Sequence, residues 1–172
     1  MDDLGAIGTK AITFSGGGEP LLHKDIAVIM GRAIEASLDL SMITNGQSLS
    51  GLRAELLGQA KWVRVSMDYT SSEQMVASRN VPESWFDGVI TNLEQFAKTK
   101  TQSCDLGVNF IITNYNYEGL VPFAKRLKDI GVENVRFSPV YVQNFKEYHT
   151  PIANRVREQL AECQSFCDSD FT

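Results

Sequence analysis

The sequence has no long apolar run, few cysteines and no excess of basic residues. No stretch approaches the ~20 apolar residues that a membrane-spanning helix needs, and nothing resembles a signal peptide. Three cysteines in 172 residues are too few for a disulfide framework, so a reducing, cytoplasmic setting is expected. A formal net charge of −5 argues against nucleic acid and against an anionic membrane as partners.

The chain also lacks internal repeats and low-complexity linkers, and 43% of its residues are hydrophobic, as in an ordinary globular domain. Hydrophobic periodicity predicts five strands that alternate with helices. The predicted strands cover residues 11–15, 39–44, 61–67, 104–113 and 133–138. The predicted helices cover residues 21–37, 49–59, 85–98, 117–130 and 151–167, with loops at 70–80 and 140–150. Residues 1–10 look too short for a complete element.

This alternation favours a parallel α/β sheet, either doubly wound or a full or partial (β/α) barrel. In residues 62–68 apolar Val63 and Val65 alternate with polar Arg64 and Ser66, so one face of the strand is apolar and the other polar. We infer that helices cover one side and that the polar side lines a wide or incomplete barrel lumen. The alternative is a solvated sheet face, which is typical of antiparallel sheets rather than parallel ones.

Three consecutive glycines follow the first predicted strand, and Glu19 and Pro20 come directly after them. Glycines leave the backbone open to close approach by a ligand, and Glu19 adds one acceptor suited to an ammonium group. A phosphate-binding P-loop would have a lysine where Pro20 stands. The alternative interpretation is a glycine-rich turn with a surface glutamate.

Three motifs occur in order, each at the end of a predicted strand: Gly16-Gly-Gly-Glu19, Met42-Ile-Thr-Asn-Gly46 and Val63-Arg-Val-Ser-Met-Asp68. Together they resemble the radical S-adenosylmethionine (radical SAM) superfamily across residues 10–140. The resemblance implies a partial (β/α)6 TIM-like barrel of parallel strands, here without the first strand. It also implies an enzyme whose reduced [4Fe–4S] cluster cleaves S-adenosylmethionine to a 5′-deoxyadenosyl radical, which abstracts hydrogen from a substrate.

The resemblance assigns cofactor contacts at the strand ends. Glu19 would hold the ammonium group of the cofactor, and Ser66 would lie near its ribose or carboxylate. Arg64 is either a second donor to that carboxylate or the ion-pair partner of Asp68 or Glu19. The residues expected to bind the cofactor are Gly16, Gly17, Gly18, Glu19, Thr44, Asn45, Ser66 and Asp68. The residues expected to bind the substrate are Asn114, Arg136 and Ser138.

The sequence departs from the family in one respect, because no Cys-x3-Cys-x2-Cys loop precedes Ile12. The cluster ligands are therefore expected to lie outside this chain, which would be either a fragment or a domain that has lost the chemistry, and inactive alone. The partners implied are a small-molecule or peptide substrate and an electron donor for the cluster. The alternative function is a cluster-free barrel module that binds a nucleotide or phosphate-like ligand at the glycine turn.

Two parts of the chain are expected. Residues 1–150 would form the barrel core, and residues 151–172 a C-terminal helix that is a candidate start of an accessory domain. Cys163 and Cys167 lie four residues apart in that helix. They are either part-buried thiols or ligands of an auxiliary cluster.

Overall fold

A single parallel sheet forms the centre of the computed structural model, which describes residues 2–172. The strands lie side by side in sequence order, and every neighbouring pair is parallel. They are β1 (Ala11–Phe14), β2 (Asp39–Thr44), β3 (Trp62–Ser66), β4 (Asp105–Ile112) and β5 (Asn134–Pro139). Within the described chain β1 and β5 are the two edges of the sheet, so the barrel is partial, as predicted.

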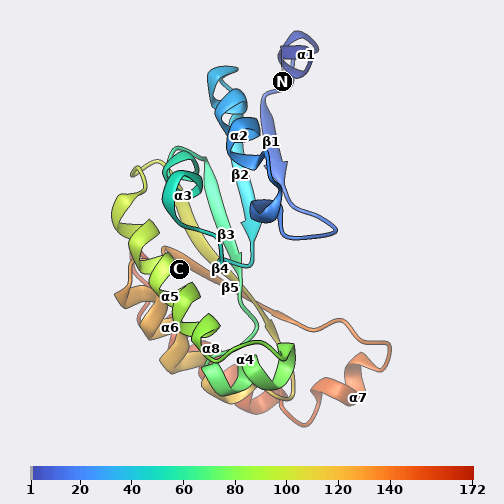
Figure 1. Ribbon diagram of the computed structural model, residues 1–172. Helices are drawn as coiled ribbons and strands as arrows, with labels where there is room; N and C mark the ends of the chain where they lie inside the picture. The colour runs from blue at the N-terminus through green and yellow to red at the C-terminus, as the bar shows by residue number, and fades with distance from the viewer. Residues whose placement is uncertain (1) are drawn as a thin grey trace.

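Helices α2, α3, α5 and α6 cover one face of this sheet, and α8 packs against α6 (Figure 1). The α-helices are α1 (Asp2–Ala6), α2 (Ile26–Glu35), α3 (Gly51–Leu57), α4 (Ser72–Arg79), α5 (Ser84–Thr99), α6 (Leu120–Asp129), α7 (Phe145–His149) and α8 (Ala153–Gln164). Two 3-10 helices, η1 (Pro20–Leu22) and η2 (Tyr117–Gly119), follow β1 and β4. None of these helices is both long and apolar enough to cross a membrane.

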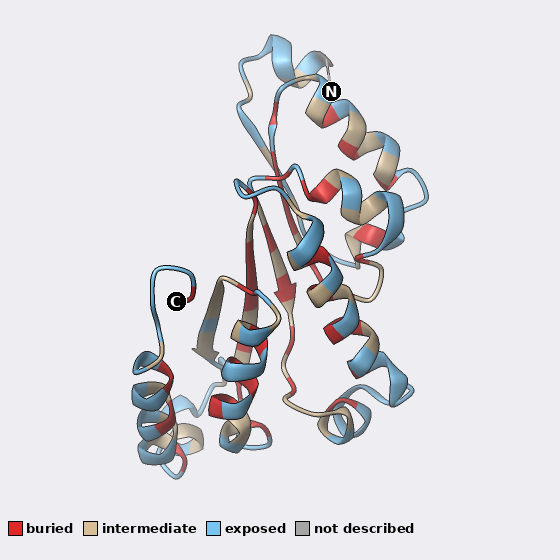
Figure 2. Cartoon of the chain, turned by 90° about the vertical axis from the view of Figure 1, so that its left-hand side faces the viewer, coloured by how far each residue is buried: buried red, intermediate tan, exposed pale blue. Residues whose placement is uncertain are grey.

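The covered face carries the core. Met42, Val63, Val65 and Val108 share this face through the strand register, and all four are fully buried. Figure 2 shows buried residues, in red, along the strands and on the helix sides turned toward them. Burying each such side chain contributes about 1.5–3 kcal/mol. The helix-side residues of α5 that complete this layer are Phe86, Val89, Ile90, Leu93 and Phe96.

The opposite face of the sheet is largely polar, as the alternation predicted. The register places Ser66 beside Asn109, and Asn109 beside Arg136, across β3, β4 and β5. Ile43 and Ile111 are apolar exceptions on this face. Across residues 2–172 no helical layer comparable to the first covers this side of the sheet (Figure 1). The polar side is thus available to line a lumen.

Several predicted boundaries are wrong. Residues 70–80 were expected to be a loop with a helical turn, yet Ser72–Arg79 form α4. The side chain of Ser71 caps this helix by accepting from the Gln74 N–H at 3.4 Å, and Asn80 ends it with a φ of 51°. Met75 is the one buried residue of α4, so the sequence of this segment lacks the hydrophobic periodicity that would predict a helix. Helices α1 and α7 were also missed, and both are only five residues long.

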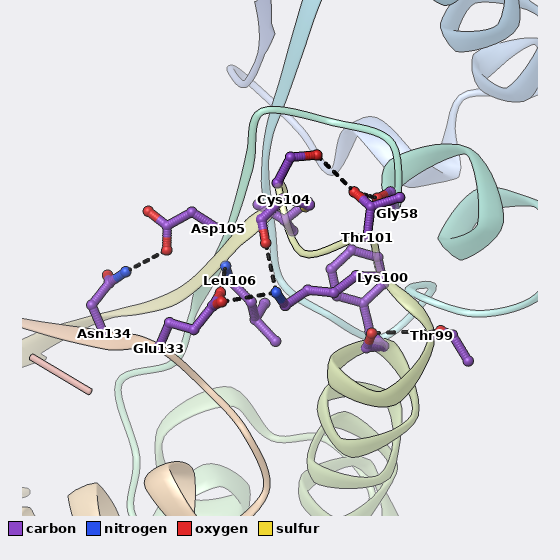
Figure 3. A network of polar contacts seen from close by, with 12 residues as sticks. Gly58, Thr99, Lys100, Thr101, Cys104, Asp105, Leu106, Glu133 and Asn134 are labelled. Atoms are coloured by element: carbon purple, nitrogen blue, oxygen red, sulfur yellow. Dashed lines mark hydrogen bonds and ion pairs between the residues drawn. The ribbon is translucent and has the colours of Figure 1, made fainter. Parts of the chain in front are cut away.

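A network of polar contacts stabilises the end of the sheet at which β4 and β5 begin (Figure 3). Lys100 Nζ donates to the Cys104 carbonyl at 2.7 Å and forms an ion pair with Glu133 at 2.9 Å. The second Glu133 carboxylate oxygen accepts from the Leu106 N–H at 2.6 Å. One lysine and one glutamate therefore fix where two adjacent strands start.

The three cysteines are expected to differ strongly in reactivity. Burial raises the pKa of the Cys104 thiol to about 11, and burial also raises the pKa of Cys163, whereas Cys167 is exposed. Since the thiolate is the nucleophile, brief treatment with iodoacetamide at about pH 8 should label Cys167 first. Peptide mass spectrometry measures the three rates. Labelling of native Cys104 as fast as Cys167 would contradict this burial.

Candidate functional site

Glu19 joins the turn after β1 to the end of β2. Its Oε1 accepts hydrogen bonds from the Leu21 N–H at 3.1 Å and from the Thr44 hydroxyl at 2.6 Å. Its Oε2 accepts from the Asn45 N–H at 2.6 Å. Hydrogen bonds to an ionised carboxylate are the stronger kind. The carboxylate therefore fixes the position of the glycine turn, and three of its roughly four lone-pair sites are used within the chain.

The Thr44-Asn45-Gly46 turn is built to receive this carboxylate. Thr44 Oγ1 accepts from the Gly46 N–H at 3.1 Å, and Asn45 Oδ1 accepts from the Gln47 N–H at 2.9 Å. Gly46 has a φ of 79°, which glycine adopts without strain. Asn92 of α5 donates to the Gly46 carbonyl at 2.9 Å and fixes the turn from the helix side.

These two turns and the end of β3 enclose a small pocket of about 240 Å³. Ser66 is only partly buried and lines this pocket, so its hydroxyl is open to a ligand there. A Cβ added at Gly17 or Gly18 would meet no atom within 4 Å, so packing does not require glycine there. The residues that line the pocket are Gly16, Gly18, Glu19, Pro20, Ile43, Thr44, Asn45 and Ser66.

Six of the eight residues predicted to bind the cofactor therefore lie around one pocket. Gly17 belongs to the same exposed turn without lining the pocket. Gly16 has a φ of 135°, a conformation that favours glycine. The side chains of Glu19, Thr44 and Ser66 come from three separate strand ends, yet they converge here. Their contact with a cofactor stays a prediction.

Asp68 lies apart from this group, two residues beyond β3. One of its carboxylate oxygens accepts from the Ile111 N–H at 3.0 Å, and the other pairs with Arg79 of α4 at 3.1 Å. Burial of the neighbouring Tyr69 raises the pKa of its phenol, and the nearby Arg79 opposes that shift. Asp68 lines a second, larger cavity at the ends of β3 and β4.

The predicted substrate residues are spread over β5 and the loop after β4. Asn114 accepts a hydrogen bond from the Tyr148 hydroxyl at 2.6 Å, which connects that loop to α7. Arg136 and Ser138 lie on the polar face of β5, and neither lines the small pocket.

Arg64 does not pair with Asp68 or Glu19, and its expected role as a second carboxylate donor is wrong. Its guanidinium forms an ion pair with Asp105 at 2.7 Å and lies over the Trp62 ring. Both partners sit at the opposite end of the sheet from the glycine turn, where β3 and β4 begin. The side chain therefore extends away from the strand ends that form the pocket.

Asn116 is a site residue that the sequence did not reveal. It is buried, and its Nδ2 donates to the carbonyls of Asp68 and Ile111, both at 2.8 Å. Its Oδ1 accepts from the Thr113 N–H at 2.7 Å. One amide thus joins the ends of β3 and β4. An asparagine in a polar loop has no local pattern that distinguishes this role.

The residues that the structure describes do not fit an iron–sulfur cluster. Residues 2–172 contain no group of three or more Cys, His, Asp or Glu side chains placed to hold a metal ion. Cys104 is at the other end of the sheet from the pocket, and Cys163 and Cys167 belong to α8 and the segment after it. Such clusters need several thiolates, which this site does not supply.

The fold and the pocket define a class: an open parallel α/β barrel with a pocket at the carboxyl ends of its first three strands. No protein-family model matches the sequence. Several solved structures share the fold, and two of them are described here. One is Streptococcus suis SuiB bound to S-adenosylmethionine, with a TM-score of 0.69 and 18% identity over 94% of this chain and 36% of that one. The other is a domain of pyruvate-formate lyase-activating enzyme from Bacteroides vulgatus, with a TM-score of 0.67 and 14% identity over 90% of this chain and 95% of that one.

Sequence relatives point the same way. The chain is 29% identical to the S-adenosylmethionine-dependent nucleotide dehydratase of Selenomonas ruminantium, over 67% of this chain and 44% of that protein. It is 28% identical to the probable GTP 3′,8-cyclase of Methanocaldococcus jannaschii, over 88% of this chain and 51% of that protein. It is 33% identical to the PqqA peptide cyclase of Rhodopseudomonas palustris, over 46% of this chain and 21% of that protein. The chain thus spans about half or less of the length of these relatives. These similarities agree with the resemblance of the sequence to the radical S-adenosylmethionine superfamily.

Proposed function

We infer that this chain is the cofactor-binding barrel of a radical SAM enzyme, and that its small pocket holds the methionine end of S-adenosylmethionine. One observation carries the proposal. The glycine turn with Glu19, the Thr44-Asn45 turn and Ser66 come from three strand ends, and they line one pocket with backbone groups, a carboxylate and a hydroxyl. A zwitterionic ligand needs such a combination of acceptors and donors.

Each group in the pocket has a defined task. The carbonyls of the glycine turn and the remaining lone pair of Glu19 accept from the cofactor ammonium. The Ser66 hydroxyl donates to its carboxylate. Glu19 acts mainly by position, because its three accepted hydrogen bonds set the turn at the right distance from β2. Asp68 is too engaged with Arg79 and Ile111 to serve as a principal contact.

The chemistry that S-adenosylmethionine would supply there is reductive cleavage followed by hydrogen abstraction from a substrate. The cluster required for this does not fit the described residues, so its ligands and its electron donor would come from outside them. The relatives named above include enzymes whose names specify nucleotides and a peptide. A small-molecule or peptide substrate at the polar face of the sheet is therefore part of the proposal.

Calorimetric titration of the 172-residue chain with S-adenosylmethionine tests the proposal. Glu19→Ala should abolish detectable binding, because it removes the carboxylate and releases the turn. Ser66→Ala leaves the hydrogen bonds of Glu19 intact. It should weaken binding about fivefold, because the loss of one hydrogen bond costs ~1 kcal/mol. Glu158→Ala, which removes an exposed carboxylate paired with Arg155 on α8, is the control and should leave binding unchanged.

Two results would contradict the proposal. One is S-adenosylmethionine binding that survives both Glu19→Ala and Ser66→Ala. The other is tight binding of inorganic phosphate at the glycine turn with none of S-adenosylmethionine, which would favour the cluster-free phosphate-binding module instead. Circular dichroism of each variant confirms that a loss of binding is not a loss of folding.

A further inference from the structure

One side of helix α5 contacts the turn that follows β2. A Cβ added to Gly46 would lie 3.0 Å from Cγ1 of Val89, so this helix packs closely against the turn. The Trp85 carbonyl accepts from Gln47 Nε2 at 2.9 Å, and Asn92 donates to the turn from the next turn of the helix. Positions 85, 89 and 92 are spaced by four and three residues, so they share one helix face. That face supports the turn that carries two of the predicted cofactor residues.

Asn92 is the polar side chain of this face. Its Nδ2 donates to the Gly46 carbonyl at 2.9 Å and to the Gln47 carbonyl at 3.1 Å. A side-chain amide has two N–H donors, so both are used on the turn. Asn92 lies inside α5, although asparagine is a weaker helix former than alanine or leucine. Its contacts with the turn, rather than the needs of the helix, therefore account for an asparagine at this position.

A series of hydrogen bonds connects Asn92 to Glu19. The Gly46 carbonyl and the Gln47 N–H belong to one peptide group, and this N–H donates to Asn45 Oδ1 at 2.9 Å. The Asn45 N–H in turn donates to Glu19 Oε2 at 2.6 Å. Hydrogen bonds in series polarise one another, so a donor on the Gly46 carbonyl strengthens the bond that the Gln47 N–H makes. Asn92 thus acts on the turn that receives the Glu19 carboxylate, although it does not line the small pocket.

We propose that Asn92 is a positioning residue for the cofactor. By holding the carbonyls of Gly46 and Gln47 it keeps the Asn45 N–H where that group fixes the Glu19 carboxylate. The pocket is then formed before a ligand arrives, and a preformed pocket binds more tightly because the ligand does not have to order it. The proposal rests on the proposed function, since it assigns a role in binding S-adenosylmethionine to a residue outside the pocket.

Calorimetric titration with S-adenosylmethionine tests the role of the two donors. Asn92→Ala should weaken binding about fivefold, because the turn loses both hydrogen bonds and has to be ordered by the ligand. Asn92→Asp keeps the shape of the side chain but replaces its donors with acceptors, so it should weaken binding at least as much. Wild-type affinity in Asn92→Asp would show that donation to the turn is not needed, and it would overturn the proposal.

Asn134→Ala is the matched control. It also removes an asparagine amide that donates a hydrogen bond, in this case to Asp105 at 2.7 Å, but at the opposite end of the sheet (Figure 3). This variant should bind S-adenosylmethionine as the wild-type chain does. Equal weakening in Asn134→Ala and Asn92→Ala would mean that binding follows general stability, and the positioning role would fail.

NMR spectra of the ¹⁵N-labelled chain without ligand give a readout that general stability does not change. A short hydrogen bond to an ionised carboxylate moves an amide proton downfield, so the Asn45 signal reports its contact with Glu19. Asn92→Ala should move this signal upfield and speed hydrogen exchange at Asn45, Gly46 and Gln47 more than elsewhere. An unchanged Asn45 signal, or faster exchange spread evenly over the chain, would overturn the proposal.

The two measurements also separate this proposal from the proposed function. If the wild-type chain and Asn92→Ala bind S-adenosylmethionine equally well, the positioning role fails while the proposed function stands. If the wild-type chain does not bind S-adenosylmethionine, the proposed function fails. The Asn45 signal then decides alone whether Asn92 sets the contact between this turn and Glu19.

Discussion

Replacing Gly46 with alanine is expected to lower the free energy of unfolding by about 3 kcal/mol, from a strained backbone and an overpacked core. Gly46 has a φ of 79°, and a Cβ there would lie 2.9 Å from Cγ1 of Val65 and 3.0 Å from Cγ1 of Val89. The valines belong to β3 and α5, so neither can move without disturbing the core. Because the same turn receives Glu19, binding of S-adenosylmethionine should weaken as well.

Urea denaturation followed by circular dichroism measures this effect, with Gly31→Ala as the matched control. Gly31 lies inside α2, and a Cβ added there would meet no atom within 4 Å. Alanine at that position should raise the stability by about 0.5–1 kcal/mol, since glycine weakens a helix interior. If Gly46→Ala were as stable as the wild-type chain, the turn would not have the close contacts described here.

The glycine turn and the Thr-Asn-Gly turn could be found in the sequence because both are local. Glycine at a turn and alternation along a strand act over a few residues, so Gly46 and Ser66 were placed correctly relative to their strands. In a parallel sheet the carboxyl ends of neighbouring strands lie at the same edge, so the residues at these ends come close together. This is why residues from β1, β2 and β3 could be predicted to meet, and the shared pocket confirms that geometry.

The environment of Asp68 could not be found in this way. Alternation puts Asp68 on the same face as Ser66, which suggested a common role for the two. The two residues differ because Asp68 forms an ion pair with Arg79. Arg79 belongs to α4, and the single buried residue of that helix gives no periodic pattern from which the helix could be predicted. Arg64 shows the same limit, because its pairing with Asp105 joins residues 41 positions apart. Ion pairs between distant residues depend on the finished packing and leave no mark in local sequence.

Replacing Lys100 with methionine is expected to lower the free energy of unfolding by about 3 kcal/mol. The side chain of Lys100 is only 7% exposed, and it donates both to the Cys104 carbonyl and to Glu133 (Figure 3). Breaking a buried ion pair by removing one partner costs about 3–5 kcal/mol, because the other charge is left uncompensated. Glu133 is 36% exposed, so water recovers part of that cost and the lower end of the range applies. Urea denaturation measures the loss.

Lys98→Met is the matched control, two residues earlier in the same chain segment. Lys98 forms an ion pair with Glu94 at 2.7 Å, but its side chain is 61% exposed, so its loss should change stability by less than about 0.5 kcal/mol. Adding Glu133→Gln to Lys100→Met should recover part of the lost stability, since no unpaired charge then stays behind. Equal effects of Lys98→Met and Lys100→Met would mean that burial does not govern the Lys100 pair.

Because this network lies at the end of the sheet away from the glycine turn, folded Lys100→Met should bind S-adenosylmethionine as the wild-type chain does, unlike Gly46→Ala. Such a result would show that the Lys100–Glu133 network stabilises the barrel, whereas the pocket at the glycine turn determines ligand binding.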